Sequence, residues 1–544
     1  MHQDLPQPSP VGQLERVRTE SSFLRLVWPF EIGRAGDRSH YERLVHGVQA
    51  AVNPEGGRLW QELDLPVDML LTHCAAHLNC WDGTPDDPVR NHETGHFWRI
   101  EKSNRASGAI FDPKREWRAR QGSGAKAQSA SFFVTDVNLV IFRQRVGFVV
   151  LEIVSRSSDP ADWLFLANRL RTLGGSGHRQ SRSGAVIEVD ASPALPFFMP
   201  VGEVGQDEAK KCSGSLGDVF EWVARDSLPD SDLSHPWVRD QALPYFSLFV
   251  DSVNDVSDGE DESPAGVADL GERVRRFFRA DQSLQATDED LSSTVITYAP
   301  DQYFSYSLDG GSFYARDAPD TEFFHRTLPD HLRRYYFLNY LFALHQRLVL
   351  MQLSDAIADR WVEAPSALDP SAGTSDAAAS ADEASKARVG SLVRAFEELR
   401  DELLEFSARG YFIQFMYSQN HHRDYRKWQE IFEVADFHRE VQSQLHEIYA
   451  ALSLRFEDIA SRRRQRVEKL ERRKTATQTS FTYILAIFGV VSLVLAFLGV
   501  PIKGETQNGI DFWKLFSYGV IAAVVGVTIA YLVHREIVRR GPPE

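Results

Sequence analysis

The most specific motif for chemistry is the run His92-Glu93-Thr94-Gly95-His96, which has the spacing H-E-x-x-H. On a helix, its two imidazoles would share one face and bind Zn²⁺, with the glutamate as general base. The flanks favour a loop instead, because prolines precede the motif, a glycine lies inside it, and Phe97–Ile100 has the composition of a strand. Two interpretations stay open: a zinc site at these histidines, and a loop in which the spacing is coincidental.

A second group of metal-ligating side chains precedes this motif. His73, Cys74, His77 and Cys80 lie close together in the chain, and three of them are spaced by three or four residues, as on one helix face. A buried helix with small apolar cysteines explains them more simply. If the segment does bind zinc, the H-E-x-x-H histidines are the expected second half of the site.

Carboxylates concentrate at Asp255–Glu262, where oxygen ligands could bind Mg²⁺ or Ca²⁺. The run lacks the ordered ligand spacing of an EF-hand, so we interpret it as a solvated acidic loop. The chain shows no Ser/His/Asp or Cys/His nucleophilic set, and Gly174–Gly184 lacks the spacing of a phosphate-binding loop. We therefore expect no enzyme activity.

A stripe of hydroxyl and small residues near the C-terminus has helical spacing. Its members lie three or four residues apart: Thr475, Thr479, Thr482, Ala486, Gly489 and Leu493. One interpretation is helix packing. The other is a pore lining, with hydroxyls at its mouth and an apolar constriction above them. Because two helices cannot enclose a channel, the pore interpretation requires an oligomer.

Two apolar runs would place this stripe in a membrane. Phe481–Val500 and Leu515–Val533 carry no charged residue, and each is long enough to cross about 30 Å of hydrocarbon as a helix. Basic residues are concentrated in Arg462–Lys474 before the first run and in Arg535–Arg540 after the second. The positive-inside rule then predicts that both termini are cytoplasmic. A pair of buried core helices is the alternative.

The chain before these apolar runs falls into segments of different composition. Residues 1–320 are mixed α/β, with expected strands at Phe132–Val134, Val137–Phe142, Val146–Val154 and Ala185–Val189 and an expected helix at Pro160–Leu173. Residues 321–424 are helical, with a flexible linker at 364–385. A stalk helix is expected over 425–474, because no proline interrupts the chain from Tyr425 to Pro501. Residues 475–544 complete the chain as a two-span transmembrane hairpin with a cytoplasmic tail.

The predicted fold class is thus an α+β cytoplasmic domain followed by a long helical stalk and two C-terminal transmembrane helices. The 544 residues include 60 Lys+Arg and 76 Asp+Glu, a net charge of −16, which argues against nucleic acid as a partner. Only 3 cysteines are present, so no disulfide framework is expected, and the bulk of the chain is expected to lie in a reducing compartment.

This arrangement resembles the CorA family of divalent-cation channels, most closely over Arg426–Arg540. The resemblance implies a homopentamer in the inner membrane that moves Mg²⁺ or a similar ion through a pore lined by the first span. The implied pore-lining residues are Thr475, Thr479, Thr482, Gly489 and Leu493. Gly499, Val500 and Pro501 stand where the family has Gly-Met-Asn, and Glu505 and Asn508 are candidates for a substitute polar ring at the outer mouth.

Three functions follow as expectations. The first is a CorA-like ion channel or transporter. The second is an effector pore that opens when its cytoplasmic sensor domain binds a small ligand. The third is a membrane-anchored signalling protein that conducts nothing.

Overall fold

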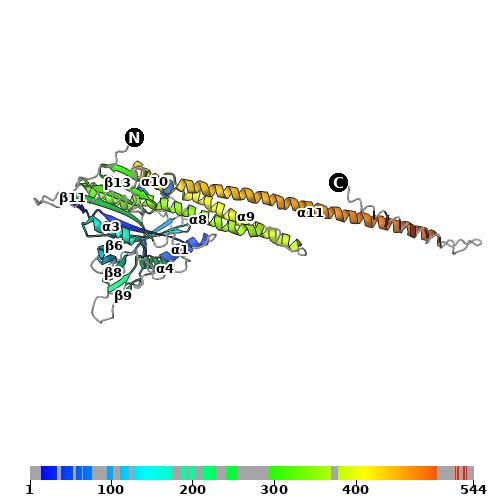
Figure 1. Cartoon of the computed structure of the whole chain (residues 1–544), viewed down its shortest axis with the longest axis horizontal. Coiled ribbons are helices and arrows are strands. Elements are labelled where there is room, and N and C mark those ends of the chain that lie inside the picture. Colours follow the sequence, from blue (N-terminus) through cyan, green and yellow to red (C-terminus); the bar gives the residue numbers. More distant parts are fainter. Residues whose placement is uncertain are drawn as a thin grey trace, which may run out of the picture. The chain divides into compact units, whose positions relative to one another are not determined.

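The computed structural model (Figure 1) describes most of the chain, in stretches with gaps between them. These stretches are 14–32, 38–52, 57–63, 65, 67–75, 95–101, 111–121, 127–173, 185–190, 195, 197–201, 211–227, 241–253, 293–368, 378–498 and scattered positions from 517 to 535. Contacts divide the chain into two compact units, Met1–His446 and Glu447–Glu544. This division does not test the boundaries expected at residues 320, 424 and 474.

A single mixed sheet contains the 14 described strands of the first unit. Their bounds are β1 Leu14–Val17, β2 Phe23–Glu31, β3 Trp60–Glu62, β4 Gly95–Ile100, β5 Glu116–Gln121, β6 Gln128–Phe142, β7 Val146–Val154, β8 Val186–Asp190, β9 Met199–Val201, β10 Lys211–Gly214, β11 Leu243–Val253, β12 Val295–Ala299, β13 Gln302–Ser307 and β14 Gly310–Arg316. The order along the sheet is β12-β13-β14-β11-β2-β7-β6-β5-β8-β10-β9, while β1 pairs with β11, and β4 pairs with β6 and β3. Among the described pairs, β11 with β14 is parallel and the others are antiparallel.

The described helices follow or interrupt these strands. They are α1 Arg38–Ala50, η1 Val67–Met69, α2 Thr72–Ala75, α3 Pro160–Leu170, α4 Leu216–Ser227, η5 Phe323–Thr327, α7 Leu328–His331, η6 Leu332–Tyr336, α8 Phe337–Leu368, α9 Ala378–Arg409, α10 Gln419–Ile431 and α11 Val434–Leu498. Both η5 and η6 are π-helical turns, which are rare and frequent at functional sites.

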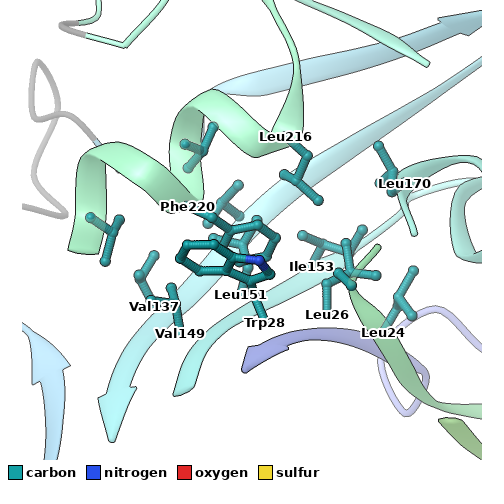
Figure 2. Close-up of a cluster of buried hydrophobic side chains, with 14 of the residues drawn as sticks. Leu24, Leu26, Trp28, Val137, Val149, Leu151, Ile153, Leu170, Leu216 and Phe220 are labelled. Carbon is teal, nitrogen blue, oxygen red and sulfur yellow. The ribbon is translucent and has the colours of Figure 1, made fainter. Parts of the chain in front are cut away.

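One face of the sheet packs against α3 and α4. Trp28 of β2 stacks on Phe220 of α4 with ring centroids 5.7 Å apart, and aliphatic side chains of β2, β6 and β7 surround the pair (Figure 2). These strands are apolar runs of β-branched and aromatic residues because both of their faces are covered. The burial of this cluster is the main favourable contribution to folding of the layer.

The opposite face of the sheet packs against η6, α8 and α10 through aromatic rings. Phe342 of α8 lies 5.4 Å from Phe142 of β6, and Phe337 lies 5.2 Å from Tyr245 of β11, both measured between ring centroids. Trp428 of α10 contacts Tyr306 of β13 at 4.8 Å. The first unit is therefore a sheet with helices on both faces, the layered arrangement of an α/β fold.

Local periodicity predicted several elements correctly. The expected strand at Val146–Val154 is β7, and the expected strand at Ala185–Val189 is β8 with a shift of one residue. The two strands expected between residues 132 and 142 form one strand, β6, with an irregularity at Val134/Asp136. The helix expected at Pro160–Leu173 is α3, which ends at Leu170.

The long helix expected from Tyr425 is broken. α10 ends at Ile431, and α11 begins at Val434, because Glu433 adopts a left-handed conformation with φ 53°. Phe432 at the break is fully buried, and Arg347 of α8 donates a hydrogen bond to its carbonyl oxygen (2.9 Å). A tertiary contact thus ends a segment whose composition favours an unbroken helix.

The segment expected to be a flexible linker is partly helical. α8 continues to Leu368 and α9 begins at Ala378, so residues on both sides of the 369–377 gap belong to helices. Alanine is frequent there and has the highest helix propensity.

None of the helices in the described stretches has the length and apolar character to cross a bilayer. This finding corrects the predicted fold class, the two transmembrane helices, the membrane and channel assignment, and the multi-pass inner-membrane location with cytoplasmic termini. The first apolar run belongs to α11 as far as Leu498, and Gly499 and Val500 lie outside the described residues. The second run lies outside the described residues except for scattered positions.

The close approach of α10 to the sheet gives a prediction. A Cβ atom at Gly311 of β14 would lie 2.5 Å from the Trp428 ring, so Gly311→Ala should lower the free energy of unfolding by about 1–3 kcal/mol. Urea denaturation followed by circular dichroism measures the change. Gly390→Ala in α9 is the control, because no atom lies within 4 Å of a Cβ atom there and helix propensity should raise stability by about 0.5–1 kcal/mol. Equal stability changes in the two variants would contradict this packing.

Candidate functional site

A cavity of about 280 Å³ lies between the sheet and the start of the helical layer, and we call it the arginine pocket. Strands β2, β4, β6 and β7 form its floor, and α7, η6 and α8 form its other side. The lining residues are Arg25, Leu63, Leu65, Phe97, Arg99, Asp136, Asn138, Val140, Val150, Glu152, Asp330, Arg333, Arg334, Phe337, Leu338 and Leu341. Four arginines and three carboxylates share this lining, so polar groups are concentrated on a sheet that is otherwise apolar.

A β-bulge in β6 turns polar residues toward the pocket. Before it, Phe132 and Val134 belong to the core cluster on the α3 and α4 side. The pairing of β6 with β7 shifts register between Val134 and Asp136, and after the shift Val137 and Leu139 belong to that cluster. Because side chains alternate along a strand, the extra residue places Asp136 and Asn138 on the pocket face.

Cross-strand register then aligns the charges. Asn138 is paired with Arg99 of β4, while Glu152 of β7 is paired with both Asp136 of β6 and Arg25 of β2. Neighbours across strands lie about 5 Å apart, so these two sets of paired residues form a polar cluster that extends over four strands.

The Glu152 carboxylate joins the sheet to the helical layer. Arg25 Nη2 lies 2.6 Å and Arg333 Nε 3.3 Å from its oxygens, and Thr135 donates a hydrogen bond to Oε1. Arg25 also donates to the Arg333 carbonyl oxygen (2.5 Å) and lies over the Phe337 ring at 4.3 Å. Burial alone would raise the pKa of Glu152, but the two arginine charges outweigh it and hold the pKa below its ordinary value.

The π-helical turn η6 brings two arginines to the pocket. Arg333 is engaged by Glu152, while Arg334 pairs with Asp330 one turn earlier at 3.6 Å and remains more than half exposed. Since the wider turn places consecutive residues differently from an α-helix, both guanidinium groups line the same cavity.

Two polar atoms of the lining have no hydrogen-bond partner among the described residues. Arg99 Nε is a buried donor and Asn138 Oδ1 is a buried acceptor. Buried polar groups are nearly always hydrogen-bonded, so an unmatched donor and an unmatched acceptor beside one cavity indicate a position for a ligand or ordered water.

Only part of the H-E-x-x-H motif lies within the residues that the structure describes. His92 lies outside the described residues, and His96 lies on strand β4 rather than on a helix. The His96 ring stacks on Trp98 at 5.4 Å, and Nδ1 lies 3.7 Å from Glu62 Oε1. No group of three metal-ligating side chains occurs in the described stretches, and the zinc site stays a prediction.

The second group of metal-ligating side chains, His73 to Cys80, also lies only partly within the described residues. Cys74 is buried in α2, its thiol faces the Gln414 carbonyl oxygen at 3.6 Å, and burial raises its pKa to about 12. Such a thiol is a packing group and a poor nucleophile at neutral pH. His77, Cys80 and the acidic run Asp255–Glu262 lie outside the described residues.

The expected pore-lining residues all lie on or beyond α11. The hydroxyl groups of Thr475, Thr479 and Thr482 donate to the carbonyl oxygens four residues earlier (2.7–2.9 Å), so the helix backbone satisfies them. Gly489 is exposed and Leu493 belongs to the same helix. Gly499, Val500, Pro501, Glu505 and Asn508 lie outside the described residues.

A buried carboxyl group also joins three elements on the far side of η6 and α8. Asp424 of α10 is fully buried, Tyr306 of β13 donates to its Oδ1 (2.7 Å), and Asn339 of α8 donates to its Oδ2 (2.9 Å). Burial raises the pKa of Asp424 to about 7, although both hydrogen bonds lower it. The nearby His421 is held neutral, because burial lowers its pKa to about 4.

Sequence reasoning missed the arginine pocket, but two signals were present. Arg25 and Glu152 are charged residues in the interior of otherwise apolar strands, FLRLVWPFE and VGFVVLEIV, and Asp136 and Asn138 interrupt a third apolar run. A charge inside a fully buried strand requires a partner, and pairing such charges would have indicated this site.

Comparison with known proteins returned no match among protein-family models or among curated proteins. The resemblance to the CorA family stays a prediction.

Loss of the Glu152 charge should destabilise the fold. Glu152→Gln would leave the Arg25 and Arg333 guanidinium groups without their buried counter-ion, and breaking such a group typically costs about 3–5 kcal/mol. Urea denaturation at pH 7 measures the loss. Glu188→Gln is the control: its pair with Arg120 spans 3.6 Å at the surface, and we expect a change below about 1 kcal/mol.

The buried Asp424 carboxyl should make stability fall with rising pH. Its folded pKa of about 7 lies above the ordinary value of 3.8, so the folded state binds the proton more tightly. The contribution of this carboxyl group is therefore fully present below about pH 4, falls between pH 4 and 7 by on the order of 4 kcal/mol, and is absent above. Asp424→Asn should remove this contribution, as measured by urea denaturation at several pH values. A wild-type slope that persists in the variant would contradict the assignment.

Proposed function

We propose that this protein is a ligand-responsive regulatory protein whose first unit binds a small anionic ligand in the arginine pocket. The observation that carries the proposal is the unmatched Arg99 Nε beside the unmatched Asn138 Oδ1 in a cavity with four guanidinium groups. Its volume of about 280 Å³ lies just below the usual range for ligand sites, about 300–1,000 Å³, so a small ligand is expected.

The charges of the pocket favour the binding of an anion beside Arg99. Glu152 already neutralises much of Arg25 and Arg333, and Arg334 has Asp330. Within the described residues, Arg99 is the guanidinium group of the lining that forms no ion pair. A planar guanidinium group binds carboxylate or phosphate oxygens in a bidentate manner, so Arg99 is the expected primary contact.

The remaining lining defines the rest of the ligand. Asn138 Oδ1 would accept a hydrogen bond from an N–H or O–H group of the ligand. Phe97, Leu63 and Leu338 offer apolar contact around it. The expected ligand is therefore a small phosphorylated or carboxylated molecule that also carries a hydrogen-bond donor.

A regulatory role is supported by the position of the pocket between two layers. Its floor belongs to the sheet and its opposite side to η6 and α8, so a bound anion would attract both layers. A ligand shifts a conformational equilibrium only if it binds one arrangement better, and a site shared by two layers meets this condition. The ion transport that the CorA resemblance implies stays a prediction of the sequence.

Arg99→Ala should weaken binding of inorganic sulfate or phosphate at least tenfold, as measured by isothermal titration calorimetry. A charge-assisted hydrogen bond is worth about 1.5–3 kcal/mol, and about 1.4 kcal/mol corresponds to a tenfold change in affinity. Arg118→Ala is the matched control, because Arg118 is an exposed arginine of β5 that does not line the pocket. Equal affinity of the two variants and the wild type, or no binding by any of them, would overturn the proposal.

A further inference from the structure

The helical segment formed by η6 and the start of α8 has two functional faces. Arg333 and Phe337 line the arginine pocket, while Asn339 points to α10 and donates to Asp424. Asn339 also donates to the His421 carbonyl oxygen at 2.9 Å. One helical segment thus contacts both the pocket and a buried carboxyl group.

The layer between pocket and carboxyl group consists of aromatic rings. Tyr245 lies 5.2 Å from Phe337 on the pocket side and 5.9 Å from Phe304, and Phe304 lies 4.8 Å from Tyr306, the donor to Asp424. Tyr245 also donates a hydrogen bond to the Leu332 carbonyl oxygen of η6 (3.0 Å). These rings exclude water, so charges on the two sides interact across a medium of low dielectric constant.

Asp424 has no basic side chain among its hydrogen-bond donors, which are a phenol and an amide. A fully buried carboxylate with neutral donors exchanges its proton near neutrality, in agreement with its pKa of about 7. The titratable or charged groups facing this cluster are Tyr245 of β11, Tyr298 of β12, Tyr306 of β13, Tyr336 of η6, His331 of α7, and His421 and Arg423 of α10. The pKa values of these four tyrosines are raised, so they stay neutral at physiological pH.

We propose that Asp424 regulates the arginine pocket, so that the pocket binds its anion more tightly when the Asp424 carboxyl group is protonated than when it is ionised. This inference rests on the proposed function. An anion in the pocket and an ionised Asp424 are like charges separated by a desolvated aromatic layer, and each opposes the other. By linkage, a bound anion must in turn favour protonation of Asp424 to the same degree.

The test is the affinity for inorganic sulfate between pH 5.5 and 8.5, measured by isothermal titration calorimetry. Sulfate keeps the same charge over this range, so any change comes from the protein. We expect wild-type affinity to fall at least fivefold across neutrality, within the usual range of allosteric coupling. Asp424→Asn, a near-isosteric neutral variant, should retain the low-pH affinity throughout.

A second variant keeps the test valid if Asp424→Asn does not fold. Tyr306→Phe removes a hydrogen bond that stabilises the ionised form, so the midpoint of the affinity change should move to higher pH. Any dependence on pH that remains in Asp424→Asn belongs to other titratable groups of the protein.

The outcomes separate the two proposals. Sulfate binding that depends on Arg99 but changes identically with pH in wild type and Asp424→Asn would overturn the regulation and leave the ligand site standing. Absence of sulfate binding at every pH would overturn both. A fall in affinity in the wild type that Asp424→Asn abolishes would support both.

Discussion

The buried ion pair of Glu152 with Arg25 and Arg333 is the interaction on which the architecture of the first unit depends. The carboxylate belongs to the central strand β7, one guanidinium group to the neighbouring strand β2, and the other to η6. The ion pair therefore connects the sheet to the helical layer. Without this carboxylate, the buried Arg25 charge and the partly buried Arg333 charge would be strongly unfavourable. The charges therefore determine where η6 lies on the sheet, and apolar packing alone would leave this position less specific.

Two local irregularities turn this interface into a site. The bulge in β6 changes which side chains face the helices, and the π-helical turn η6 places Arg333 and Arg334 along the same cavity. Both features depart from regular geometry at the same place. Without the register shift, Asp136 and Asn138 would face the α3 and α4 side, so the bulge adds two polar side chains to those that β2, β4 and β7 present to the pocket.

The helical layer carries polar groups on its second side as well. Asp424, Tyr306 and Asn339 join α10, β13 and α8, and the break at Glu433 separates α10 from α11. The Arg347 contact to the Phe432 carbonyl oxygen holds this break against α8. The same segment of η6 and α8 thus contacts both the arginine pocket, where we propose that an anion binds, and the buried Asp424 carboxyl group.

The sequence by itself determined β7, β8, α3 and the course of β6, because alternation and helical periodicity are local properties. It predicted two membrane spans from two apolar runs, and the described helices do not support them. Only the tertiary structure decided that Arg25, Arg99, Glu152 and Arg333 lie around one pocket. Arg25 and Arg333 are more than 300 residues apart in the sequence, and the order of the strands in the sheet brings them together. Spacing along the chain reveals residues on one element, whereas a site built from four strands and a helix depends on pairing and register that no local pattern contains.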